Sequence, residues 1–137
     1  MVGSAGHLVA QRFLEQRLGE VGCEPYVADS FRLPYVMEGM DFVNLIGVIP
    51  GQDRSLSPLL IGAHYDSVIA APCADDNGAA VAICLAVAAA AKAQGDLSRD
   101  LIIAIFDAEE PPFFQRETMG SYRFYKDQLD ERGVHFA

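Results

Sequence analysis

The chain has 137 residues, of which 51% are apolar, 21% charged and 9% aromatic, and its formal net charge is −9. This composition excludes a disordered chain, a collagen-like repeat and a disulfide scaffold, and the length fits one domain with a core. The acidic balance argues against nucleic acid as a partner. The longest apolar stretch, residues 81–91, is about half a membrane span, which argues against an integral membrane protein.

The first predicted element is an amphipathic helix over residues 8–21, where apolar side chains recur at helical spacing before Gly22. A strand is expected over Tyr26–Leu33, because Pro34 would end it. A stronger strand is expected over Phe42–Ile49, followed by a proline–glycine turn. These elements predict that the first third of the chain is a helix followed by two strands.

Two short apolar runs, Leu59–Ala63 and Leu101–Phe106, are typical of central strands that are covered on both faces. Between them, Ala79–Ala93 is rich in alanine and apolar nearly all round, which predicts a buried helix that ends at Gly95. A last helix is expected over Met119–Leu129. This order predicts an α/β fold with a mixed, largely parallel sheet and helices on both faces.

Polar clusters follow the predicted strands or precede the predicted helix, where ligands bind in α/β sheets. The clusters are His64 with Asp66, Asp75 with Asp76, and Glu109 with Glu110. None of them contains a lysine or arginine, so converging carboxylates would need another counter-charge, which a divalent cation supplies. One histidine among several carboxylates favours zinc or manganese over calcium.

The adjacent glutamates suggest two different roles. Consecutive side chains on extended backbone point to opposite sides. Of Glu109 and Glu110, one could bind the metal while the other takes a proton from the attacking water. The pattern therefore predicts metal-assisted hydrolysis.

Each cluster also has a simpler explanation. His64 alone could be a hydrogen-bonded histidine at a strand end, and residues 75–77 could cap the following helix. Glu109 and Glu110 could be a solvated pair before two prolines. Residues 113–114, both phenylalanine, could form a pocket wall or a lid on the core, and the other histidines, among them His7, are expected at the surface.

Five segments of the chain, taken together, resemble the zinc aminopeptidases of peptidase family M28. Their order, spacing and strand context agree with that family. They are Asn44-Leu45-Ile46-Gly47, His64-Tyr65-Asp66-Ser67, Ala74-Asp75-Asp76-Asn77-Gly78-Ala79-Ala80, Phe106-Asp107-Ala108-Glu109-Glu110 and Met119-Gly120-Ser121. The resemblance implies a zinc-exopeptidase-like fold and two zinc ions in a complete site.

The resemblance also implies a role for each site residue. His64 and Glu110 would each bind one metal, and Asp76 would bridge both. Asp66 would support the histidine, and Glu109 would be the general base. The family's bridging aspartate stands four residues before a glycine, which selects Asp76 over its neighbour although this chain has an alanine at that place.

The family needs two further ligands, an aspartate and a histidine, and neither has a match after Met119. Asp127 and Asp130 fall in a predicted surface helix, and His135 lies three residues from the end on no strand. Each ion would keep two of three protein ligands, whereas a catalytic zinc site has three. We therefore expect an N-terminal half of such an enzyme, inactive when isolated, whose unfinished sheet edge favours a homo-oligomer.

These observations predict a di-zinc exopeptidase, most closely an aminopeptidase acting on a peptide substrate. Two alternatives remain, namely a truncated, non-catalytic relative that acts as an association module and a glutaminyl-cyclase-like acyl transferase with one zinc. The run from Asp107 to Glu110 and the segment around Asn44 modestly favour the peptidase.

Features relevant to cellular location are few. The N-terminus shows no signal-peptide pattern. The three cysteines, Cys23, Cys73 and Cys84, have no close-spaced pair and are expected as free thiols, which leans toward the cytoplasm.

Overall fold

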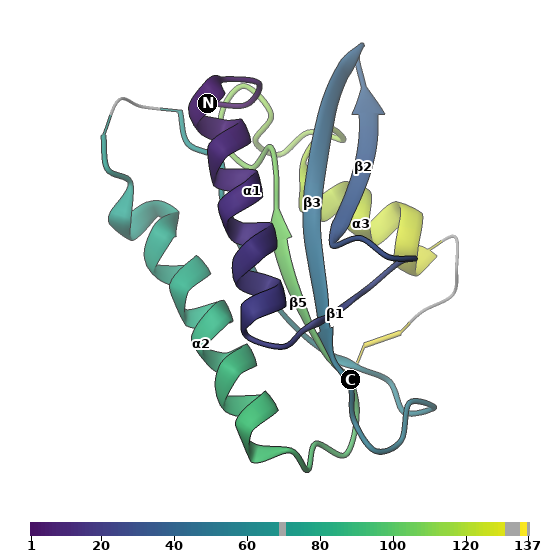
Figure 1. Cartoon of the computed structure of the whole chain (residues 1–137). Helices are drawn as coiled ribbons and strands as arrows, with labels where there is room; N and C mark the ends of the chain where they lie inside the picture. The colour runs from purple at the N-terminus through teal and green to yellow at the C-terminus, as the bar shows by residue number, and fades with distance from the viewer. Residues whose placement is uncertain (69–70, 131–134, 137) are drawn as a thin grey trace.

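Two long helices, α1 (Ala5–Glu20) and α2 (Ala79–Gln94), lie along one face of a five-stranded sheet in the computed structural model (Figure 1). The structure describes residues 1–68, 71–130 and 135–136. The strands are β1 (Glu24–Pro25), β2 (Arg32–Met37), β3 (Met40–Ile49), β4 (Leu59–His64) and β5 (Leu101–Phe106). The remaining elements are the π-type turn η1 (Ala74–Gly78), the short helix α3 (Gly120–Phe124) and its continuation η2 (Tyr125–Asp130).

The sheet is mixed, as expected, but it is not largely parallel in the described residues. The strand order is β1-β3-β5-β4. The strand β2 also pairs with β3, on the same side of β3 as β1. Only β4 and β5 run parallel, because α2 provides the crossover that a parallel pair needs. β2 and β3 are joined by a two-residue turn, Glu38-Gly39, with positive φ at both positions, which makes this pair antiparallel.

Helices cover both faces of the sheet, which confirms the predicted architecture. Alternate residues of β3 and β5 face opposite layers, as the two-residue period of a strand requires. Leu45 and Ile103 pack with α1 and α2, whereas Ile46 and Ile102 pack with Phe124 of α3. All four sheet residues are nearly or fully buried, so both faces of the central strands are covered.

The alanine-rich helix α2 is buried along one stripe only, contrary to the expectation of a fully buried helix. Its buried side chains are Val81, Cys84, Ala88 and Ala91. Ile83 is 62% exposed and Val87 is 39% exposed. Ala74–Gln94 is long and apolar enough by composition to cross a membrane, with 22% of its most apolar window buried, but its stripe packs on the sheet.

The first predicted strand was misplaced. Most of residues 26–31 lie outside regular strands, and Pro34 sits inside β2 rather than after it. A proline is tolerated there because β2 pairs with β3 alone and turns its other side outward. The other strands match their predictions to within about two residues, and the predicted last helix corresponds to α3 with η2.

Candidate metal site and general base

The parallel pair β4–β5 brings two of the predicted clusters to one edge of the sheet. His64 is in register with Phe106, the last residue of β5, and the Tyr65 N–H donates to the Phe106 carbonyl at 3.0 Å. The residues that follow these strands therefore emerge side by side. This confirms the expectation that the two strand ends meet.

His64 is the centre of the candidate site. Its side chain is 7% exposed, and its Nε2 lies 3.0 Å from Asp76 Oδ1 and 3.5 Å from Glu109 Oε2. Its Nδ1 lies 3.4 Å from Asp66 Oδ1. One ring nitrogen thus faces two carboxylates, and the other nitrogen faces the buried supporting aspartate.

Asp66 joins the two strand ends. Its two carboxylate oxygens accept the backbone N–H groups of Glu109 and Glu110, each at 3.0 Å, while Oδ1 also faces His64. Its side chain is 1% exposed. The aspartate therefore contacts the histidine and also holds the backbone of residues 107–110, which we call the glutamate turn.

Asp76 comes from η1, which we call the aspartate loop. Its side chain is 74% exposed, and its contact with His64 is the single polar contact recorded for it among the described residues. The proposed capping role for residues 75–77 is absent, because Gly78 is the N-cap of α2 and no side chain caps it. The backbone of Asp76 is non-helical (φ −115°, ψ 90°) and lies beside the histidine.

The two glutamates differ in their surroundings. Glu109 faces His64 and is 30% exposed. The Glu110 carboxylate makes no recorded hydrogen bond or ion pair with other described residues, although its backbone N–H is held by Asp66. The structure thus gathers His64, Asp66, Asp76 and Glu109 and leaves the Glu110 carboxylate unpaired in the described part.

The charges of the site perturb its own titration. Burial lowers the pKa of His64, but the hydrogen bond and charge of Asp66, with Glu109 and Asp76, raise it to about 9. Burial raises the pKa of Glu109, His64 opposes this rise, and the neighbouring carboxylates add to it. Burial also acts to raise the pKa of Asp66, yet its hydrogen bonds from His64 and the glutamate turn lower it overall.

The donor types at this edge fit zinc, but the set is incomplete. Nitrogen and oxygen ligands of one tetrahedral zinc lie roughly 3.3 Å apart for bonds of about 2.0–2.1 Å. The contact between the two expected ligands His64 and Asp76, at 3.0 Å, is close to that spacing. Within the residues that the structure describes, no group of three or more His, Cys, Asp or Glu side chains could hold a metal ion.

The sequence analysis assigned no such role to two residues that support the glutamate turn, Asn44 and His7. Asn44 accepts the Asp107 N–H at 3.0 Å and donates to the Gly120 carbonyl at 2.8 Å. His7 is buried at 6% exposure and contacts Asp107, whereas it was expected at the surface. The available signal was that His7, Gln11 and Leu14 share one helical face.

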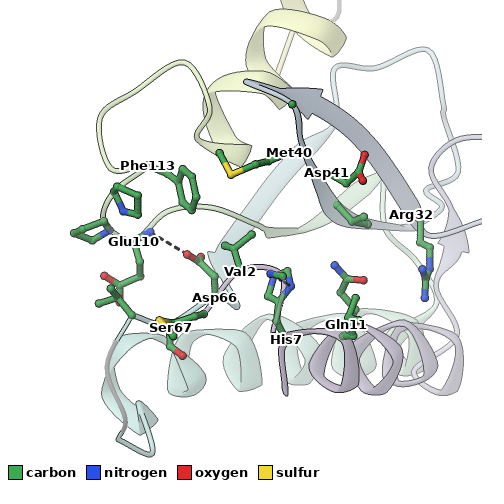
Figure 2. Close-up of a pocket in the computed structure, with 18 residues that line it drawn as sticks. Val2, His7, Gln11, Arg32, Met40, Asp41, Asp66, Ser67, Glu110 and Phe113 are labelled. Carbon is green, nitrogen blue, oxygen red and sulfur yellow. Dashed lines mark hydrogen bonds between the residues drawn. The ribbon is translucent and has the colours of Figure 1, made fainter. Parts of the chain in front are cut away.

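A cavity of about 730 Å³ lies beside the site (Figure 2). Asp66 and Glu110 border it on one side, Phe113 forms part of its apolar wall, and Arg32 lies at the far side in this view. Phe113 also packs edge-on against the buried Phe42, with ring centroids 5.1 Å apart. It therefore lines the cavity and also packs on the core.

Comparisons with known proteins identify the family and the fold of this chain. A vacuolar membrane protease of Schizosaccharomyces pombe is 36% identical over 84 residues, which are 61% of this chain and 10% of that protein. LapB from Legionella pneumophila (TM-score 0.71, 22% identity) shares the fold over 97% of this chain and 35% of its own.

Two further solved structures share the fold. One is a Zn-dependent exopeptidase from Parabacteroides distasonis, with a TM-score of 0.66 and 24% identity, which is matched over 92% of this chain and 49% of that one. The other is an Acidobacteriales bacterium glutaminyl cyclase, with a TM-score of 0.73 and 20% identity, which is matched over 96% of this chain and 47% of that one. This chain thus spans less than half of each of the three solved structures. The model of peptidase family M28 matches residues 44–135, so the chain belongs to peptidase family M28.

Proposed function

We propose that this chain supplies the first part of a zinc-dependent exopeptidase site, most closely that of an aminopeptidase. The observation that carries the proposal is that His64 Nε2 faces the carboxylates of Asp76 and Glu109 where β4 and β5 end. Membership of the peptidase family supports hydrolysis of a peptide bond. The cavity beside Glu110 offers room for part of a peptide.

In this proposal, His64, Asp76 and Glu110 would hold zinc, which when bound polarises the scissile carbonyl and acidifies water. Asp66 keeps the imidazole turned so that Nε2 faces Asp76. Glu109, whose pKa is raised above its ordinary value, accepts the proton of the attacking water and passes it to the leaving amine. The unpaired Glu110 carboxylate is available to a metal.

One observation favours a second candidate, a non-catalytic relative that serves as an association module. No three-donor group exists among the described residues, so the chain on its own has fewer ligands than a catalytic zinc site has. For this reason we expect the isolated chain not to hydrolyse peptides. Acyl transfer of the glutaminyl cyclase kind would use a similar donor set with one zinc, and its substrate distinguishes it from peptide hydrolysis.

The first experiment is a zinc titration of the chain by calorimetry, with native mass spectrometry to count metal ions and subunits. We expect zinc binding that Asp76→Asn weakens about tenfold or more, since it exchanges a ligand carboxylate for an amide. Glu109→Gln is the matched control, because a general base is not a ligand and its loss should leave the zinc affinity nearly unchanged. Absence of zinc binding would favour the non-catalytic candidate.

The second experiment measures cleavage of an aminoacyl anilide and cyclisation of a peptide with N-terminal glutamine. The isolated chain should show neither reaction. Chelator-sensitive anilide cleavage that Glu109→Gln abolishes would show that the chain completes its own site, for example as an oligomer. Chelator-sensitive cyclisation without cleavage would support the acyl transferase.

A further inference from the structure

A buried pair of polar side chains links the start of α1 to the glutamate turn. His7 Nε2 lies 2.8 Å from Asp107 Oδ1, and the two side chains are 3% and 0% exposed. The residues are 100 positions apart in the chain, so the pair is a tertiary contact. Neither residue belongs to the candidate metal site.

Asp107 uses both carboxylate oxygens to shape the turn. Its Oδ1 accepts the Ala108 N–H at 2.8 Å, and its Oδ2 accepts the Val43 N–H at 3.0 Å. Ala108 has a φ of +54°, a left-handed conformation that residues with a side chain rarely adopt. The buried carboxylate therefore stabilises the bend that immediately precedes Glu109.

After that bend, the backbone is held by a second buried carboxylate. The N–H groups of Glu109 and Glu110 both donate to Asp66. The turn is thus linked to α1 through the contact of Asp107 with His7, and to the end of β4 through Asp66. Together the two aspartates fix the direction in which the Glu109 side chain leaves the backbone.

His7 is itself held in one orientation. Its Nδ1 accepts the Gly3 N–H at 3.3 Å, so the ring hydrogen sits on Nε2, which donates to Asp107. The ring stacks on Tyr65, with centroids 4.9 Å apart and planes 10° apart. The Gly3 N–H and the Tyr65 ring therefore orient His7 so that its Nε2–H points at the Asp107 carboxylate.

We propose that His7 is a positioning residue for Glu109, acting through Asp107 and the left-handed bend at Ala108. A buried carboxylate that loses one of its donors is disfavoured, so loss of His7 weakens the hold on Asp107, whose carboxylate then relies on the backbone N–H groups of Ala108 and Val43. The catalytic consequence rests on the function proposed above, but the contact and its effect on the backbone do not depend on zinc.

The test is residue-resolved amide hydrogen exchange of the metal-free chain by NMR. His7→Leu should raise the exchange rates of the Ala108 and Val43 amides about tenfold or more, with a smaller rise at Glu109. His7→Gln should restore protection, because its amide nitrogen occupies the place of Nε2. If His7→Leu does not fold, His7→Asn replaces it, since its amide lies nearer the place of Nδ1.

The matched control is Gln11→Leu. Gln11 is 4% exposed on the same face of α1, and its side chain donates to the Tyr65 hydroxyl at 2.9 Å, which in turn donates to the Val43 carbonyl at 3.0 Å. The control therefore perturbs the surroundings of Val43 without removing the His7 contact, so the discriminating amides are Ala108 and Glu109. A rise at these two amides that is larger than in this control and is reversed by His7→Gln supports the proposal. No rise, or an equal rise in both leucine variants, overturns it. Because the chain is free of zinc throughout, failure of zinc binding would contradict only the proposed function.

Discussion

The two arms of the candidate site are built differently. The glutamate turn is anchored by two buried carboxylates, Asp66 and Asp107, and by hydrogen bonds to Asn44. The aspartate loop presents Asp76 on a side chain that is 74% exposed and meets only His64 among recorded polar contacts of the described residues. The fold thus holds the backbone of Glu109, the proposed general base, whereas Asp76, the proposed bridging ligand, lies on an exposed loop.

The largest expected effect comes from breaking the anchored arm at Asp66. Asp66→Ala leaves two buried N–H groups and His64 without their partner, which should lower the free energy of unfolding by about 3–5 kcal/mol. The control is Asp75→Ala, at an exposed position of the aspartate loop, which should change the free energy of unfolding by less than about 0.5 kcal/mol. If urea unfolding gave the same loss of unfolding free energy for both variants, the two arms would not differ in how firmly they are built.

His64 connects the two arms, and its protonation should make the metal-free protein depend on pH. Its pKa is raised from 6.5 to about 9, so its stabilising contribution is complete below pH 6.5 and is lost as the pH rises through about 9. Chelator-treated wild type should lose on the order of 2–3 kcal/mol across this window. His64→Gln should show a flat profile there, and an equally steep decline in that variant would refute the assignment.

Gly120 packs against the anchored arm from the α3 side. A Cβ atom there would lie 2.8 Å from the Asp107 backbone nitrogen and would overlap the Asn44 side chain and the Asp107 carbonyl more closely still. Gly120→Ala should therefore lower the melting temperature and cost about 1–2 kcal/mol. Gly19→Ala in α1, where the nearest atom is 3.7 Å away, should be neutral or slightly stabilising.

The smallest stability effect is expected for the exposed arm. Asp76→Ala should change the unfolding free energy of the metal-free protein by less than about 0.5 kcal/mol, because exposed ion pairs contribute little. Added zinc should raise the melting temperature of wild type more than that of this variant. A large loss without metal would mean that the loop is as firmly built as the glutamate turn.

Much of the fold could be predicted because local sequence determines it. The apolar runs 42–49, 59–63 and 101–106 fall in strands, and Gly95 ends α2 with a φ of +74°. Strand direction could not be predicted in the same way, since the pairing of β3 with β5 joins residues more than fifty positions apart. The strand predicted over 26–33 failed because Pro34 was interpreted as an end, whereas an outer strand tolerates it.

The candidate site divides along similar lines. Residue types and strand-end positions predicted that His64, Asp66 and Glu109 would lie close together, and the family resemblance selected Asp76. The support from His7 depends on a tertiary contact across 100 positions. A lone histidine on a helix carries no local signal of its partner, and only its place on the buried face of α1 hinted at it.

The two borders of the sheet have different chemistry. On one side, β1 and β2 each contain a proline, Pro25 and Pro34, whose nitrogen cannot donate to a further strand. On the other side, β4 contains no proline and pairs only with β5 among the described strands. Among the described strands, one border therefore carries prolines that hinder the addition of a strand, whereas the border beside His64 carries none. Any segment that joins there, from this chain or another, arrives next to the candidate site.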